Sequence, residues 1–154
     1  MKKYSGVLVK CGNEVLLCRR NHNNGMGEWS IPSGKLDKKV TNNGTEKVII
    51  FEDYVSGAKR EFFEETNHSI DNENLSFISI TERRTRDGKQ IKGFLYMYLL
   101  EIENRIFPDF TNAKDGDEHD NFGYFGVDNL PLKISPQLES VIKLVLKKDC
   151  QCQF

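Results

Sequence analysis

Three glutamates in the middle of the chain have the type and spacing needed to hold a metal ion. Glu61, Glu64 and Glu65 stand at i, i+3 and i+4, so a helix would place all three carboxylates on one face. Like charges repel at this spacing, and near a helix C-terminus the dipole disfavours each anion by about 0.3–1 kcal/mol. A hard divalent cation prefers carboxylate oxygens and would offset both costs. The cluster therefore predicts a Mg²⁺ site; the alternative is a solvated acidic helix face that serves solubility alone.

The residues around these glutamates form a longer pattern. Glu52 is followed by seven residues and then by the segment 60–65, Arg-Glu-Phe-Phe-Glu-Glu, while upstream the segment 29–35 reads Trp-Ser-Ile-Pro-Ser-Gly-Lys. The pattern resembles the signature of the Nudix hydrolases, in which a Trp-x-x-Pro-Gly-Gly loop leads to a glutamate and then to Arg-Glu, an apolar residue, any residue and Glu-Glu. About ten positions match in chemistry, so the resemblance is specific over 29–67 and looser over the rest of the chain.

One departure from the signature is an insertion. Seventeen residues separate Gly34 from Glu52 where the family has five, so about twelve are added, over about 37–51. Asn43-Gly44 beside a β-rich run predicts a β-hairpin, and an inserted loop of this length is entropically tolerable. The hairpin is expected to project beside the pocket and to form an extra wall around a long ligand.

The other departures are substitutions. Asn67 replaces the Gly that follows the helix, which is conservative because Asn also adopts the left-handed conformation. Ser33 replaces the second Gly of the loop and His68 replaces an apolar residue. None of these changes removes a carboxylate, so the metal site is expected to be intact.

The resemblance implies a role for each signature residue. Glu64 and Glu65 are the first metal ligands, and Glu61 is either a further ligand or the general base. Arg60 belongs to the site as the residue that pairs with Glu52 or Glu61 and fixes the helix to the loop. The expected cofactor is Mg²⁺, with Mn²⁺ as a substitute, because such an ion activates water and neutralises phosphate charge.

Further site residues are expected outside the signature helix. Glu118, in the acidic stretch 115–120, is the best-placed extra metal ligand or general base acting through a water, and a solvated acidic loop is the equal alternative. Guanidinium groups bind phosphates, a glycine lets backbone approach a ligand, and aromatic rings stack on bases. The residues expected to bind substrate on these grounds are Arg20, Trp29, Gly34 and Tyr124.

Several other residues favour ordinary structural roles. Arg83, Arg84 and Arg86 are expected to be solvated hairpin charges, although each could grip a phosphate. Phe94 is expected in the core. The lone histidines His22 and His119 are expected at the surface, although His119, beside Glu118, could touch the site.

Strand and helix patterns predict an α+β fold. We expect a single Nudix-type domain over 1–154, an α/β/α sandwich with a mixed sheet between two helices. The second helix should begin at Ser135-Pro136 and bury a stripe at 138, 141, 142 and 145. The expected strands are 4–10, 14–20, 29–32, 75–84, 90–102 and 122–127, and the first helix is 56–66.

Composition fits a small soluble enzyme. The chain has 154 residues and a net charge of −1, so no overall field attracts nucleic acid. No stretch is long and apolar enough for a membrane span, and the N-terminal residues do not form an apolar signal region. Four cysteines in a chain of this length do not form a disulfide framework, so reduced thiols and a cytoplasmic location are expected.

The expected reaction, by the resemblance, is Mg²⁺-dependent hydrolysis of a small nucleotide such as ADP-ribose, NADH or a dinucleoside polyphosphate. The inserted hairpin favours such longer ligands over nucleoside triphosphates. Cleavage of capped RNA is an enzymatic alternative, and a nucleotide-binding module that does not cleave is the non-enzymatic one. A homodimer is compatible with the sequence, with the hairpin or the C-terminal tail as its contact.

Overall fold

The computed structural model describes residues 1–21, 25–71 and 74–147. His22 and the C-terminal cysteines at 150 and 152 lie outside the described residues. The elements, in chain order, are β1 (Lys2–Cys11), β2 (Glu14–Arg20), β3 (Trp29–Ser30), β4 (Ser33–Lys35), β5 (Lys38–Asn43), β6 (Glu46–Phe51), α1 (Tyr54–Thr66), β7 (Leu75–Arg84), β8 (Ile91–Ile102), η2 (Gly116–Glu118), β9 (His119–Phe125), η3 (Val127–Asn129) and α2 (Pro136–Lys147).

The main sheet is mixed. Its order is β3-β2-β1-β8-β7, with β4 added on β1 and β9 added on β2. β1 and β8 are parallel over their whole length, whereas every other pairing is antiparallel. The parallel pair joins strands about 90 positions apart in the chain, so it places the N-terminal strand at the centre of the sheet.

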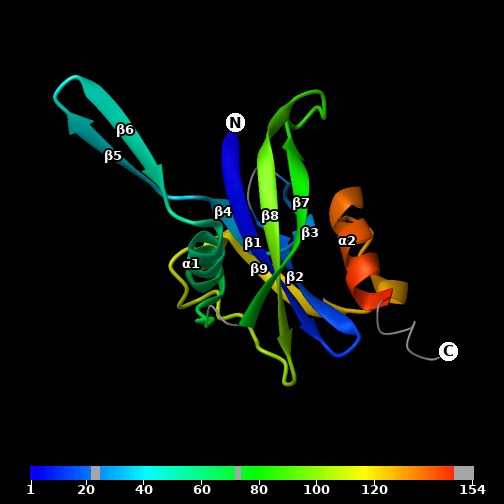
Figure 1. Ribbon diagram of the computed structural model, residues 1–154. Coiled ribbons are helices and arrows are strands. Elements are labelled where there is room, and N and C mark those ends of the chain that lie inside the picture. The colour runs from blue at the N-terminus through cyan, green and yellow to red at the C-terminus, as the bar shows by residue number, and fades with distance from the viewer. Residues whose placement is uncertain (22–24, 72–73, 148–154) are drawn as a thin grey trace.

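Two helices cover opposite faces of this sheet (Figure 1). One buried cluster lies between the sheet and α2, and it includes the predicted stripe Leu138, Val141, Ile142 and Val145. The other lies between the sheet and α1 and is centred on Phe62, which is fully buried. The predicted α/β/α sandwich, with a mixed sheet between two helices, is therefore confirmed.

The ends of α1 follow from its capping residues. Asp53 is the N-cap and accepts hydrogen bonds from the backbone N–H and hydroxyl of Ser56, at 2.8 and 2.9 Å. Asn67 closes the helix with φ of +64° and donates its backbone N–H to the Phe63 carbonyl at 2.9 Å, as expected for an Asn that replaces Gly. Within the helix, a Cβ on Gly57 would lie 2.5 Å from Leu36, so a glycine allows α1 to approach the sheet closely.

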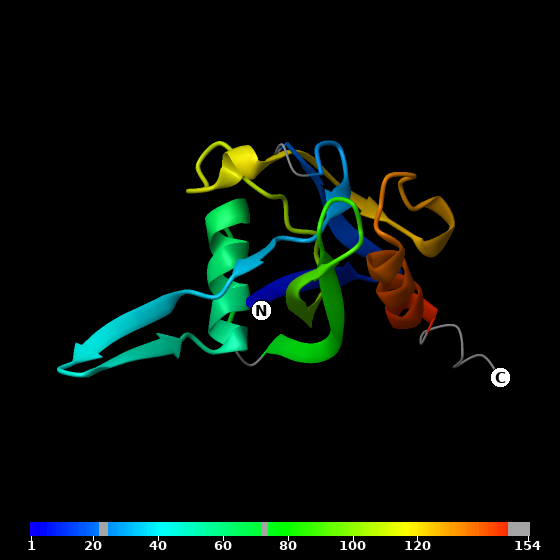
Figure 2. The same cartoon turned by 90° about the horizontal axis from the view of Figure 1, so that it is seen from above.

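The insertion forms a separate hairpin. β5 and β6 pair only with each other, and all of their residues are exposed. Its neck is closed by two hydrogen bonds, because Glu52 N–H donates to the Asp37 carbonyl at 2.9 Å and Asp37 N–H donates to the Glu52 carboxylate at 2.7 Å, so Glu52 keeps its position beside α1. In both views the hairpin extends away from the body, from near the N-terminal end of α1 (Figures 1 and 2). Neither view shows it over the C-terminal half of α1, so the two views give no support to a wall around a ligand within one chain, and that wall stays a prediction.

Two sequence expectations about burial are wrong. Phe94 is 37% exposed because it lies on the α1 side of β8, beyond the area that α1 covers. His119 is 4% exposed because β9 pairs with β2 and brings it against α1.

Over the described residues, no helix combines the length and apolarity required to cross a bilayer.

Candidate active site

The three glutamates in the C-terminal half of α1 are buried to different degrees. Glu65 is 2% exposed, whereas Glu61 and Glu64 are half-buried with side chains 14% and 19% exposed. Glu65 shares its burial with Phe62 and Thr66, which anchor α1 to the sheet. One face of α1 therefore holds both packing residues and carboxylates.

Arg60, on α1, pairs with several carboxylates and ties the helix to the loop that precedes it. Its guanidinium contacts Glu52 at 2.6 Å, Glu64 at 3.0 Å and Glu61 at 3.1 Å, and it donates to the Lys35 carbonyl at 2.9 Å. Partial burial acts to lower the pKa of Arg60, but the hydrogen bonds and charges of Glu52 and Glu61 outweigh it and raise the pKa. The predicted pairing of Arg60 with Glu52 and Glu61 is confirmed.

Gly34 lies directly against the Glu61 carboxylate. A Cβ on Gly34 would stand 2.3 Å from Cδ of Glu61 and 2.4 Å from both carboxylate oxygens. Any other residue would displace that carboxylate. Gly34 is therefore required by a side chain of the candidate site and is not an ordinary turn glycine.

The acidic loop before β9 is attached to the end of α1. Asp115 N–H donates to the Glu64 carbonyl at 2.7 Å, and Asp109 N–H donates to the Thr66 carbonyl at 2.9 Å. These bonds satisfy carbonyls that the end of a helix leaves without partners. The attachment brings exposed Glu118 close enough to raise the pKa of both Glu61 and Glu65.

Burial and mutual repulsion make these carboxylates hard to ionise. Burial is the larger cause, and with the charges of Glu64 and Glu118 it raises the pKa of Glu61 to about 7 in spite of Arg60. Burial, Glu61 and Glu118 together raise the pKa of Glu65 well above the ordinary value. A protein that gathers carboxylates at this cost has a use for a cation among them.

His119 adds a neutral ring to the buried side of the cluster. Its Nδ1 stands 3.7 Å from Oε1 of Glu65, which is too far for a hydrogen bond. Burial, followed by the charge of Arg20, lowers the pKa of His119 to about 4. Nδ1 of His119 and Oε2 of Glu65 are both buried without a hydrogen-bond partner in the described part of the chain. Sequence reasoning favoured a surface position for this histidine over a place in the site, because only strand pairing buries it.

The donor set fits a hard divalent cation. The groups available are carboxylate oxygens, one of them the unpartnered Oε2 of Glu65, and their charge needs neutralisation. Over residues 1–21, 25–71 and 74–147, no three acidic, imidazole or thiol groups already converge as ligands. Arg60 holds Glu61 and Glu64 instead, so either carboxylate would have to exchange Arg60 for the ion.

The predicted substrate residues are placed differently from one another. Arg20 ends β2 near the cluster, since its charge acts on both Glu65 and His119. Trp29 packs on the α2 side of the sheet, edge-on to Phe125 at 5.1 Å. Tyr124 packs in the α1-side core, and its hydroxyl donates to the Ile106 carbonyl at 2.7 Å. The structure therefore brings Arg20 and Gly34 to the glutamates, whereas Trp29 and Tyr124 serve packing.

Among the hairpin arginines, Arg83 was misjudged from sequence. It is half-buried, and its guanidinium donates to the Ser33 hydroxyl at 2.6 Å. Arg84 is exposed and pairs with Glu82 at 2.7 Å, and Arg86 is exposed, as expected. Arg83 and Arg84 differ in burial because consecutive residues of a strand point to opposite sides.

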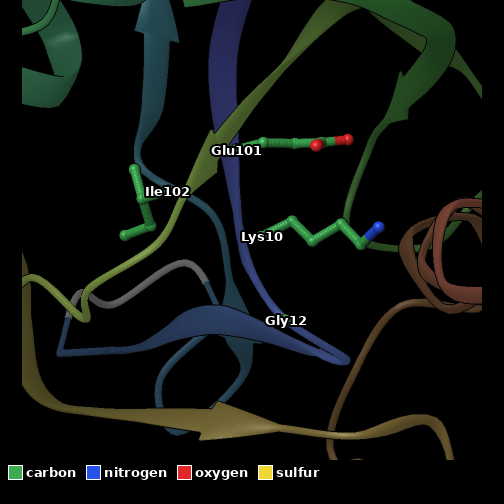
Figure 3. Close-up of a pocket in the computed structure, with 4 residues that line it drawn as sticks. All are labelled: Lys10, Gly12, Glu101 and Ile102. Atoms are coloured by element: carbon green, nitrogen blue, oxygen red, sulfur yellow. The ribbon is translucent and has the colours of Figure 1, made fainter.

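A shallow depression elsewhere is lined by Lys10, Gly12, Glu101 and Ile102 (Figure 3). Lys10 and Glu101 come from register-paired positions of β1 and β8, and their side chains lie side by side in the close-up. None of the site glutamates lines this depression, and a single carboxylate beside an ammonium lacks the chemistry described above. The glutamate cluster is the candidate active site.

Comparison with known proteins shows the family and the fold of the chain. The NUDIX domain model matches residues 3–145. The fold is similar to that of a MutT NUDIX hydrolase from Burkholderia pseudomallei, which is 18% identical with a TM-score of 0.71 over 94% of this chain and 97% of that chain. It is also similar to an Ap4A hydrolase from C. elegans, 18% identical with a TM-score of 0.66 over the whole of both chains.

A third similar structure is a bifunctional NMN adenylyltransferase/ADP ribose pyrophosphatase from Francisella tularensis, complexed with AMP and a Mn ion. It is 18% identical with a TM-score of 0.64, and the match covers 97% of this chain and 42% of that chain. At these identities the structural likeness shows the fold. No match was found among curated proteins.

Proposed function

Since the chain belongs to the NUDIX family of hydrolases, we propose that it hydrolyses a pyrophosphate bond in a nucleoside diphosphate derivative with the help of Mg²⁺. The observation that carries the proposal is the buried carboxylate of Glu65, whose Oε2 has no partner among the described residues and whose pKa is raised by burial and by Glu61 and Glu118. A divalent cation would bind the unpartnered oxygen and stabilise the charged form of the carboxylate. Mn²⁺ would serve as a substitute for Mg²⁺.

Each carboxylate has a proposed role. Glu64 and Glu65 hold the ion, and Glu61 joins them as a ligand positioned by Arg60 and Gly34. When bound, Mg²⁺ activates water and neutralises charge on the phosphates. Glu118 is the exposed member of the four, so water reaches its carboxylate. We propose that it accepts the proton of the attacking water as general base or serves as a further metal ligand. Arg20 is close enough for its charge to act on Glu65 and would bind a phosphate.

The proposed substrates are ADP-ribose, NADH and dinucleoside polyphosphates. Support comes from the similar structures named as an Ap4A hydrolase and as an ADP ribose pyrophosphatase. Capped RNA has less support, because Arg84 is engaged with Glu82 and Arg83 is half-buried instead of displayed at the surface. We place the reaction in the cytoplasm, for which the free thiols of Cys11 and Cys18 are suited.

The test is product release from a panel of ADP-ribose, NADH, diadenosine polyphosphates, nucleoside triphosphates and capped RNA, with Mg²⁺ or with EDTA. We expect Glu64→Gln to lower turnover by about 100-fold or more, as expected for a metal ligand. Glu139→Gln is the matched control, because Glu139 lies on α2 and is 3.8 Å from Lys143. Turnover that survives EDTA would refute the metal dependence, and saturable binding with no turnover on any member would refute the hydrolase.

A further inference from the structure

Arg83 is a charged residue for which the fold supplies too few partners. Its Nε is fully buried and has no hydrogen-bond acceptor among the described residues. The contacts of its guanidinium in the described part of the chain are the Ser33 hydroxyl at 2.6 Å and the face of the Tyr4 ring at 5.4 Å. No described carboxylate lies within ion-pair distance of it. A guanidinium in such a place is costly unless an anion completes its surroundings.

The neighbourhood of Arg83 shows where that anion would come from. Arg83, on β7, contacts Ser33, which is the neighbour in β4 of Gly34, the glycine that lies against the Glu61 carboxylate. Burial lowers the pKa of Arg83, and the charge of Arg20 lowers it further. The charges of Glu28 and Glu65 act in the opposite sense from beyond contact distance. Two guanidinium groups therefore lie close enough for their charges to repel, beside a site that we propose to bind phosphates.

We propose that Arg83 binds a phosphoryl oxygen of the substrate and, with Arg20, selects ligands that carry a pyrophosphate group. Guanidinium donors match the oxygens of a phosphate in pairs, and Nε is one of the donors that this arrangement leaves available. The inference rests on the proposed function for its substrate class. It assigns to Arg83 the phosphate-binding role that the sequence pattern ranked below a solvated hairpin charge.

The test compares three substitutions on adjacent positions. We expect Arg83→Gln to raise KM for ADP-ribose by about 10- to 100-fold, the effect of losing charge-assisted hydrogen bonds, and to change kcat less. Arg83→Lys keeps the charge and the stem but not the paired donors, so it should fall between. Arg84→Gln removes the same charge from the next residue, which is exposed and paired with Glu82, and should leave KM unchanged.

A purely structural role is distinguished by Ser33→Ala, which removes the Arg83–Ser33 bond and leaves the guanidinium in place. If Arg83 only anchors the 29–35 segment, Ser33→Ala will reproduce Arg83→Gln, and the inference is wrong. It is also overturned if Arg83→Gln and Arg83→Lys, both folded by thermal unfolding, have wild-type KM.

Calorimetric binding of inorganic pyrophosphate in EDTA separates this inference from the proposed reaction. A protein without turnover that binds pyrophosphate, and loses that binding in Arg83→Gln but not in Arg84→Gln, would refute the hydrolase and retain the role of Arg83. Turnover in the wild type together with unchanged pyrophosphate binding in Arg83→Gln would do the reverse.

Discussion

Replacing Glu61 by Gln should make the metal-free protein more stable at neutral pH than the wild type. In the folded protein, burial together with the charges of Glu64 and Glu118 raises the pKa of Glu61 from 4.5 to about 7. A raised pKa means that the folded state holds a proton that the unfolded state releases. The stabilisation is therefore fully present below pH 4.5 and is lost as the pH rises through about 7.

The magnitude follows from the two pKa values. Each pKa unit corresponds to about 1.4 kcal/mol, so the full change is about 3 kcal/mol, and screening by solvent at a side chain that is 14% exposed reduces it to about 1–3 kcal/mol. Gln has nearly the same shape and no titrating proton. The free energy of unfolding of Glu61→Gln, minus that of the wild type, should therefore increase by this amount from pH 5 to pH 8.

The assay is urea unfolding in EDTA at several pH values, followed by the same series in Mg²⁺. The wild-type profile alone is a poor test because His119, whose pKa is lowered to about 4, contributes stability that is regained as the pH rises from 4 to 6.5. The difference between the two proteins cancels that contribution. A difference that does not vary with pH would refute the account of Glu61, and Mg²⁺ should stabilise only the wild type strongly.

Two further predictions concern Gly34 and the hairpin. Gly34→Ala should lower kcat/KM by about 10-fold or more, while the free energy of unfolding changes by less than about 1 kcal/mol, because the new Cβ displaces the end of a flexible side chain. Adding Gly34→Ala to Glu61→Ala should lower kcat/KM little further. Full additivity of the two effects would show that Gly34→Ala acts elsewhere. Deleting 38–50 should leave the substrate ranking unchanged and reduce self-association in light scattering, because Val40, Val48, Ile49, Ile50 and Phe51 are exposed on a hairpin that points away from the site. A changed ranking would mean that the hairpin reaches a pocket.

Local sequence chemistry determined the positions of the elements and the metal-site helix. The i, i+3 and i+4 spacing placed three carboxylates on one helix face, and Asn67 ended that helix in the left-handed conformation. Asn43-Gly44 predicted the hairpin, and the stripe on α2 predicted its buried side. All of these features depend on residues within a few positions of one another, which is why a single sequence was sufficient.

Tertiary structure decided the surroundings of those residues. His119 is buried because β9 pairs with β2, and Arg83 is half-buried because it meets Ser33, fifty positions away. Tyr124, expected to stack on a base, instead donates its hydroxyl to Ile106. The periodicity of a strand shows which residues share a face, but only the packing of distant segments determines what covers that face. Burial, and with it the pKa of Glu61 and Glu65, therefore followed from the fold alone.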